Sequence, residues 1–443
     1  MKSKKFVLAA LALLAITMVL LPLAGCKNDT VPPEVEKQEQ TNDTNDTTNT
    51  EDNTSGGDTG DSTSGGNGGG SETDKNNTAA KLVSISVIPP TRTVYSVRQE
   101  FDHTDMVVTA TYDDGESKDV TDLATTNFDT VADEKGLNKP VTVSYKEGET
   151  SKSDTFTVTV FPAEVKVLTG YTSPNNTGSD WTYVAFGEWP QSEASGVSPT
   201  LVAPQPDNLF KDKYYSDANG EYVKEGGKYY KVEPIVWRVL TTSYKAPEGG
   251  TVGEILLLAE KILTGGIKWA DNSNDYMQSY IRKWLNGNSG TGKTSDYNGD
   301  AGFLQTAFIE SAQNLIADTT VDNSAASTTD AGNNLTQADG CSDTKDKIFL
   351  LSQQEATTLN SGFGAYSEED STRIRVTTDY AEATGAYQVD PSAGYGGRWW
   401  LRSPDYYNES RARFIDFDGD AYNTLPVNYT NWGVVPALSI SLK

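Results

Sequence analysis

The chain has 443 residues and a formal net charge of −26 at pH 7, because 62 Asp and Glu residues outnumber 36 Lys and Arg residues. A surface this acidic repels phosphate backbones and anionic lipid headgroups, which argues against nucleic-acid binding and against a polybasic membrane patch. The single histidine, His103, excludes catalysis by a histidine pair and a zinc site built from several histidines.

The first 25 residues are typical of an export signal. Three lysines precede an apolar run over residues 6–21, and Leu23-Ala24-Gly25-Cys26 follows. The run is short and ends in small residues, as in a cleaved signal peptide rather than a membrane-spanning helix. The tetrapeptide resembles the bacterial lipobox, which implies that Cys26 is diacylated, becomes the first residue and tethers the protein to a lipid bilayer. The alternative is an ordinary secreted protein in which Cys26 is incidental.

Residues 26–80 are predicted to form a flexible acidic tether. Asn, Thr, Asp, Ser and Gly dominate this segment. It can bury too little apolar area to offset its ordering entropy, so we expect it to hold the folded parts away from the bilayer. Beyond Cys26 the sequence has one further cysteine, Cys341, which cannot form an intramolecular disulfide.

Residues 81–162 have the pattern of a β-sandwich. Apolar and polar residues alternate over 83–87, 141–145 and 155–160, which places one face of each strand on a core. Asp113-Asp114-Gly115 is typical of a tight hairpin turn. The segment 107–121 and the closing Thr-Phe-Thr-Val-Thr-Val resemble bacterial Ig-like domains. That resemblance implies a spacer or adhesive module.

Residues 163–443 are predicted to form an α+β domain. A helix is expected from a cap at Asn274 or Asp275 to a C-terminal cap at Gly287. A second helix is expected over 302–316, an exposed insertion over 317–346, and a short helix over 353–359. Strands are expected over residues 183–190, 234–240, 254–260, 347–352, 398–402, 412–418 and 432–441.

Four segments of this domain resemble a domain of unknown function that recurs in bacterial surface proteins. They are Phe186-Gly-Glu-Trp-Pro-Gln191, Pro234-Ile-Val-Trp-Arg-Val-Leu240, Arg398-Trp-Trp-Leu-Arg-Ser-Pro404 and Trp432-Gly-Val-Val-Pro-Ala-Leu438. The resemblance implies no established activity. The order of helices before a Trp-rich β-region also resembles, more distantly, the C-type lectin-like fold shared with formylglycine-generating enzymes. A fold does not specify a function.

Two departures from those relatives limit what they imply. Formylglycine-generating enzymes use a cysteine pair, whereas this domain has Cys341 alone. Sugar-binding C-type lectins hold calcium with a tripeptide such as Gln-Pro-Asp and a later Trp-Asn-Asp. Gln205-Pro206-Asp207 occurs here before both predicted helices, and the sequence has no Trp-Asn-Asp. We therefore interpret the tripeptide as a turn.

The segment Gly287-Asn-Ser-Gly-Thr-Gly-Lys293-Thr294 matches the P-loop pattern of phosphate-binding proteins. A P-loop lies between a buried strand and a helix, whereas here a helix precedes the glycines and no helical periodicity follows them. A glycine-rich loop accounts for the segment better.

Asp416, Asp418 and Asp420 alternate around a Gly and are a weak candidate for a calcium site, since calcium prefers clustered oxygen ligands. A solvated Asp-Gly hairpin is the competing interpretation. We therefore expect no cofactor, with calcium at these aspartates as the alternative.

The best ligand-binding candidates surround the Trp-rich segment. Trp399 and Trp400 are adjacent on a predicted strand, so their side chains point to opposite faces, and one of them could lie in a groove. An exposed Trp beside Arg402, Asp405 and Tyr406 would suit stacking on a sugar or contact with a protein. The competing interpretation places both tryptophans in the core.

These features predict a bacterial surface lipoprotein whose C-terminal domain recognises a glycan or a protein. We expect binding rather than catalysis. One alternative is a hydrolase of surface polysaccharide that uses two carboxylates roughly 5–10 Å apart. The other is a structural envelope protein without a small ligand.

Overall fold

The computed structural model describes residues 79–175, 181–244, 253–287, 301–323, 342–358, 362–365, 369–405, 408–421 and 423–442. Several predictions fall outside these ranges. They concern the signal segment, Cys26, almost all of the tether, the residues that follow Gly287 in the P-loop match, Cys341 and Tyr406. The described side chains form two separate hydrophobic cores, one over residues 82–160 and one from Phe161 onward. None of the described helices is both long and apolar enough to span a membrane.

The N-terminal core lies between two sheets, as predicted. One sheet contains β1 (Leu82–Ile88), β3 (Val107–Tyr112) and β4 (Ser117–Asp119), and the turn between β3 and β4 has Gly115 at φ 85°. The other contains β2 (Val94–Ser96), β7 (Thr150–Phe161), β6 (Gly136–Glu147) and β5 (Thr125–Thr126). A short helix, α1 (Phe128–Ala132), contributes Phe128 to the same core.

The predicted alternation along β1 is wrong at Val83. The pairing register of β1 with β3 shifts between Leu82 and Ser84, so Leu82 and Ile85 are buried and Val83 is 48% exposed. A single irregular residue in a strand exchanges the faces on which the neighbouring side chains lie.

The C-terminal part is built on a sheet around the long strand β13 (Lys228–Tyr244). On one side β13 pairs with β9 (Tyr183–Ala194), which in turn pairs with β8 (Lys166–Leu168). On the other side it pairs with β12 (Gly220–Glu225) at one end and β14 (Glu254–Ala259) at the other. Beyond β14 lie β21 (Ala437–Ile440) and β17 (Ile348–Phe349).

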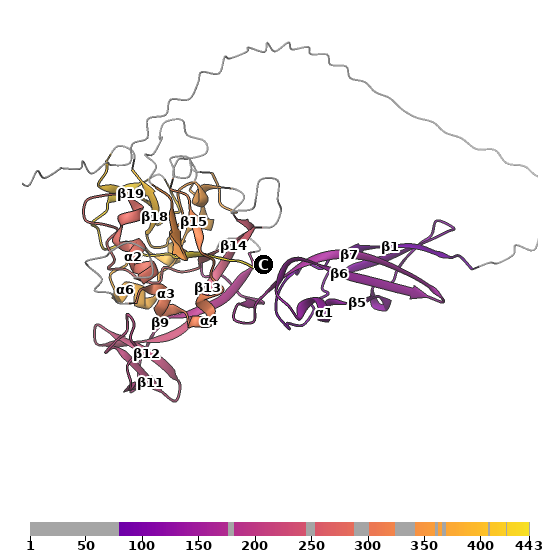
Figure 1. Ribbon diagram of the computed structural model, residues 1–443, viewed down its shortest axis with the longest axis horizontal. Coiled ribbons are helices and arrows are strands. Elements are labelled where there is room, and N and C mark those ends of the chain that lie inside the picture. Colours follow the sequence, from indigo (N-terminus) through magenta and orange to yellow (C-terminus); the bar gives the residue numbers. More distant parts are fainter. Residues whose placement is uncertain are drawn as a thin grey trace, which may run out of the picture.

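Residues 200–231 form a projecting β-structure that we call the arm. It contains β10 (Thr200–Leu201), β11 (Tyr214–Asp217), β12 and the first residues of β13. Figure 1 shows β11 and β12 standing out from the rest of the C-terminal part. The hairpin turns at Asn219-Gly220 and Gly226-Gly227 account for the two reversals in the arm, since glycine accepts the backbone angles that tight turns need.

Both predicted helices are shorter than expected. The first begins as a 3₁₀ turn, η2 (Tyr276–Gln278), and continues as α2 (Tyr280–Asn286), which Gly287 ends with φ 64°. The second is split into α3 (Phe303–Ala307) and α4 (Glu310–Gln313). The break lies at Phe308, whose backbone is extended and whose ring packs 4.9 Å from the ring of Phe186 on β9.

A three-stranded sheet of β18 (Trp399–Pro404), β19 (Arg411–Ile415) and β20 (Thr424–Pro426) lies near the C-terminus. Before it come η4 (Glu355–Thr357), η6 (Ser371–Arg373), α6 (Asp379–Ala383) and η7 (Pro391–Ala393). The predicted insertion is wrong at its two ends, because β15 (Thr319–Val321) and β16 (Thr344–Asp346) pair and bury alternate side chains. The described residues are thus mostly strands with short helices.

The two parts of the chain join through a hydrogen-bonded contact. The hydroxyl of Ser96 on β2 donates to the carbonyl of Val165 at 2.8 Å and accepts the N–H of Val167 on β8 at 2.8 Å. Phe161, the last residue of β7, packs in the C-terminal core. Since β8 is also paired with β9, the sandwich is attached directly to the edge of the large sheet.

Candidate functional site

Trp399 and Trp400 are both fully buried on β18. The alternation of side chains is as predicted, but both faces of β18 are covered. The indole N–H of Trp399 donates to the carbonyl of Arg373 at 3.2 Å, and the ring of Trp400 packs 6.4 Å from those of Phe414 and Trp432. Neither ring has a face in solution, so the core interpretation accounts for both and the groove interpretation is wrong for both.

Arg402 is also buried, in an ion pair with Glu355. Its guanidinium donates to the carbonyl of Leu350 at 2.7 Å, and Glu355 also accepts the hydroxyl of Tyr244 at 2.8 Å. Burial alone would raise the pKa of Glu355, but the charge of Arg402 and the hydrogen bonds lower it below its ordinary value. Arg402 therefore stabilises the core instead of facing a ligand.

Asp405 holds a turn of the small sheet. Its carboxylate accepts the hydroxyl of Thr424 at 2.9 Å and lies 3.6 Å from the guanidinium of Arg411. These contacts tie the end of β18 to β19 and β20, which is a structural role. Tyr406 lies outside the described residues.

The three alternating aspartates form the predicted hairpin turn. The N–H of Asp416 donates to the carbonyl of Asp420 at 2.8 Å, and Gly419 has φ 88°. The Asp416 carboxylate accepts the Nε–H of Arg398 at 2.6 Å, and Asp418 accepts the N–H of Asp420 at 3.1 Å. Across the described ranges, no group of three or more His, Cys, Asp or Glu side chains is placed to hold a metal ion.

A different set of side chains forms an aromatic surface around this hairpin. The ring of Tyr395 lies 5.0 Å from that of Phe417, and the guanidinium of Arg398 lies 5.0 Å from Phe417 and 5.3 Å from Trp432. Trp432 lies 5.7 Å from Tyr429. We call this set, Tyr395, Phe417, Arg398, Trp432 and Tyr429, the aromatic row.

The aromatic row is accessible at its two ends. Tyr395 is 40% exposed and Tyr429 is 46% exposed, while Phe417 and Trp432 are half-buried. Tyr387, which is 56% exposed, is hydrogen-bonded through its N–H to the carbonyl of Asn431, beside Trp432. Large apolar side chains exposed together on one surface are typical of binding sites.

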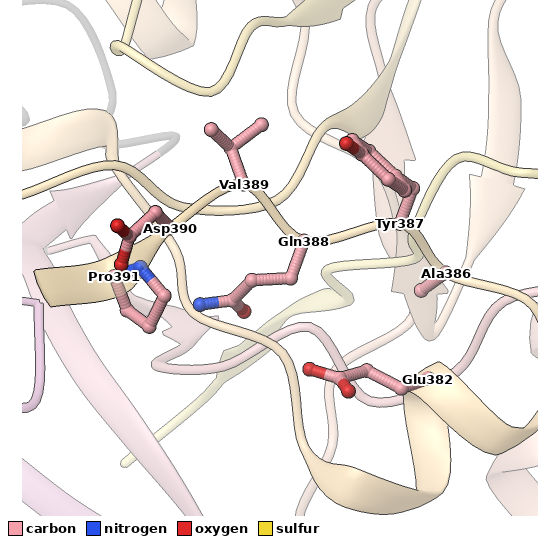
Figure 2. Close-up of a pocket in the computed structure, with 7 residues that line it drawn as sticks. All are labelled: Glu382, Ala386, Tyr387, Gln388, Val389, Asp390 and Pro391. Carbon is pink, nitrogen blue, oxygen red and sulfur yellow. The ribbon is translucent and has the colours of Figure 1, made fainter. Parts of the chain in front are cut away.

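The loop between Tyr387 and Tyr395 also lines a cavity of about 270 Å³, which Figure 2 shows. The cavity is formed by residues 386–391 together with Glu382 from α6. In Figure 2 the amide of Gln388 and the carboxylate of Glu382 point to the same side of the loop, and Val389 points to the other. The Thr377 hydroxyl lies 2.6 Å from the Glu382 carboxylate and 2.5 Å from the Gln388 side-chain carbonyl, and it can donate its one proton to either of them.

Asp390, at the far end of the cavity, is held as an anion. Its carboxylate accepts the hydroxyl of Ser392 at 2.6 Å and the N–H of Ser392 at 2.9 Å, and these bonds lower its pKa. The cavity therefore presents oxygen acceptors next to exposed aromatic rings. Such a combination suits a ligand that has both apolar faces and hydroxyl groups.

The aromatic row, the cavity and the β18 sheet lie in one stretch of the chain. Residues 252–442 match the family model described as Domain of unknown function (DUF6273), and we call this segment the DUF6273 domain. This match is consistent with the expected C-terminal domain of unknown function, and it begins at residue 252, after the arm. No curated protein matches the chain.

Most of the aromatic row was missed at the level of sequence. Arg398 and Trp432 belong to segments that resemble the family, but Tyr395 and Tyr429 of the row, and the neighbouring Tyr387, lie in loops without periodicity. Their clustering depends on three loops that meet in space. The one local signal is that each tyrosine neighbours turn-forming residues, which favours a surface position.

Proposed function

We propose that the DUF6273 domain is a recognition module that binds a surface glycan on the aromatic row. The observation that carries this proposal is the exposure of tyrosines on both sides of Trp432 and Arg398, next to a polar cavity. Aromatic rings stack on the apolar C–H faces of sugar rings, while hydroxyl groups need donors and acceptors at the edge. A protein ligand is the alternative that the same surface allows.

Arg398 supplies the donors in this proposal. Its Nε–H is bonded to Asp416, which fixes the plane of the guanidinium between Phe417 and Trp432. The terminal amino groups of an arginine are further donors that can bond sugar hydroxyls. Because the guanidinium is already oriented, binding would cost little side-chain entropy.

Several carboxyl groups of the described residues take part in ion pairs or hydrogen bonds of the fold. A glycosidase needs one carboxylic acid with a raised pKa to protonate the leaving group. In the described residues the displaced carboxyl pKa values, such as those of Glu260, Glu355 and Asp390, are all lowered by ion pairs or hydrogen bonds. The hydrolase remains an alternative that the experiment below tests.

We further propose that the protein is a bacterial surface lipoprotein, anchored outside the cytoplasm through acylated Cys26. The export signal and the small residues before Cys26 support this proposal. The acidic segment up to residue 80 would act as the tether, and the Ig-like sandwich as a spacer. The junction through Ser96 supports that role, because it joins the sandwich to the large sheet.

A glycan array tests the function directly. The full chain should bind a defined class of glycans, and a variant with Tyr395→Ala and Tyr429→Ala should lose that binding without a change in melting temperature. Ile309→Ala is the matched control, since Ile309 is 73% exposed and lies on α4's N-terminal side, away from the aromatic row in sequence. Binding that survives in the double variant would contradict the proposal, and cleavage of a bound polysaccharide would favour the hydrolase.

A further inference from the structure

A second cavity lies at the base of the arm, and we call it the arm cavity. Its volume is about 370 Å³, within the range of roughly 300–1,000 Å³ that ligand pockets occupy. Four aromatic residues form part of its wall. Trp189 and Phe210 belong to the segment before residue 252, and Trp284 and Tyr380 belong to α2 and α6. We propose that the arm cavity is a binding site for a single neutral sugar ring.

The walls of the arm cavity are aromatic rings that hold one another in place. The ring of Trp189 lies 4.9 Å from that of Phe210, 5.9 Å from that of Trp284 and 6.3 Å from that of Tyr380. The Trp189 indole N–H donates to the carbonyl of Leu263 at 3.0 Å, which fixes its orientation. The cavity is therefore formed before a ligand arrives. Because Trp189, Phe210 and Trp284 are each at most 4% exposed, their edges line an apolar base for the ligand, and the polar groups at the rim and floor carry its recognition.

Tyr380 supplies a hydrogen-bonding group for this ligand. Its side chain is 6% exposed, and its hydroxyl is not among the fully buried polar atoms that lack a partner in the described ranges, so the hydroxyl is accessible from the cavity. Burial raises the pKa of Tyr380, so the hydroxyl stays protonated and can act as a donor and as an acceptor. A ligand hydroxyl in the cavity could therefore bond this group directly.

The charged residues at the rim favour a neutral ligand. Lys213 Nζ lies 2.7 Å from the Glu225 carboxylate, and both side chains line the cavity while remaining partly exposed. The two charges compensate each other, so the rim attracts neither an anion nor a cation strongly. Neighbouring hydroxyl groups of a sugar ring could accept a hydrogen bond from the Lys213 ammonium and donate one to the Glu225 carboxylate.

The floor of the cavity adds two hydroxyl groups and a backbone turn. The hydroxyls of Thr264 and Thr384 lie 3.2 Å apart, and Thr384 accepts the N–H of Gly265 at 2.9 Å. These groups belong to the DUF6273 domain, whereas Lys213 and Glu225 belong to the arm. Sugar preference would therefore depend on the arm, a segment outside the matched domain.

This proposal is independent of the aromatic row, and one experiment separates the two sites. Saturation-transfer NMR on the purified full chain would use glucose, galactose, mannose and N-acetylglucosamine as separate probes. At least one sugar should bind, with a dissociation constant of about 1 mM, as expected for a single small ring. Tyr380→Phe should weaken that binding about fivefold to tenfold, because it removes one hydrogen bond and keeps the ring.

Two further variants make the result decisive. Lys213→Gln combined with Glu225→Gln alters the rim without touching the core and should weaken binding by a similar factor. Tyr222→Phe is the matched control, since the Tyr222 hydroxyl bonds Asp217 within the arm hairpin, and it should bind as wild type does. Absence of binding by all four sugars would overturn the proposal. Binding that is unchanged by Tyr380→Phe but lost on Tyr429→Ala would also overturn it, and would place the sugar on the aromatic row.

Discussion

At the scale of single residues, buried ion pairs organise the C-terminal domain. Arg402 pairs with Glu355, and Arg238 pairs with Glu260 at 2.8 Å with both side chains fully buried. Removing one partner of a buried pair leaves the other charge uncompensated. We therefore predict that Glu355→Gln lowers the free energy of unfolding at pH 7 by about 3–5 kcal/mol.

The pH dependence of stability follows from the same pair. The pKa of Glu355 is lower in the folded state than in the unfolded chain. Its contribution is therefore complete above the unfolded pKa of about 4.3 and is lost as the pH falls below that value toward the folded pKa. Chemical denaturation at several pH values measures this effect. As the pH is lowered from 7 toward the folded pKa of Glu355, the free energy of unfolding should fall less in Glu355→Gln than in wild type. Glu193→Gln, in an exposed pair with Lys228, is the control and should change stability by less than about 1 kcal/mol.

The two core tryptophans give a second prediction at this scale. Trp399→Ala and Trp400→Ala should each cost about 3–5 kcal/mol, because both rings are fully buried and each leaves a cavity. Thermal melts of the two variants measure this loss. A melting temperature near that of wild type in either variant would show that the ring is not part of the core.

At the scale of elements, the end of α2 is fixed by Gly287. Its φ of 64° disfavours any residue with a Cβ, and an added Cβ would lie 2.7 Å from the N atom of Gly302. We predict that Gly287→Ala costs more than about 1 kcal/mol of stability, measured by denaturant unfolding. Gly196→Ala is the control, because Gly196 has φ 72° but nothing lies within 4 Å of an added Cβ. It carries the cost of the backbone conformation without the steric clash, so its loss of stability should be smaller than that of Gly287→Ala.

Strands were easier to predict than helices or the candidate site. The apolar run of β14 and the alternation along β6 and β7 are local sequence patterns, and the burial of their side chains follows the same patterns. The helix predicted over 302–316 breaks because Phe308 packs against Phe186, a contact between residues 122 positions apart that no local pattern contains. Likewise, the two tryptophans are adjacent on a strand, as predicted, but contacts that bury them, such as those of Trp399 with Arg373 and of Trp400 with Trp432, come from other parts of the sequence.

At the scale of the whole molecule, the proposed anchor, tether, sandwich and recognition domain act in series. Cys26→Ser should release the protein from membranes or leave it unprocessed, because it removes the acylated side chain. Detergent partitioning and the apparent mass of the protein measure the effect. Unchanged partitioning and processing would refute the anchor, and Cys341→Ser is the control that should leave both unchanged.

Glycan binding by the aromatic row is the main function that we propose for this protein. The most direct measurement is the affinity of the full chain for the glycan selected on an array, compared between wild type, Tyr395→Ala with Tyr429→Ala, and Ile309→Ala. We predict that the double variant loses affinity about tenfold to a hundredfold, equivalent to roughly 1.4–2.7 kcal/mol, at an unchanged melting temperature. Ile309→Ala should keep the wild-type affinity. Equal affinity in all three proteins would contradict the proposal.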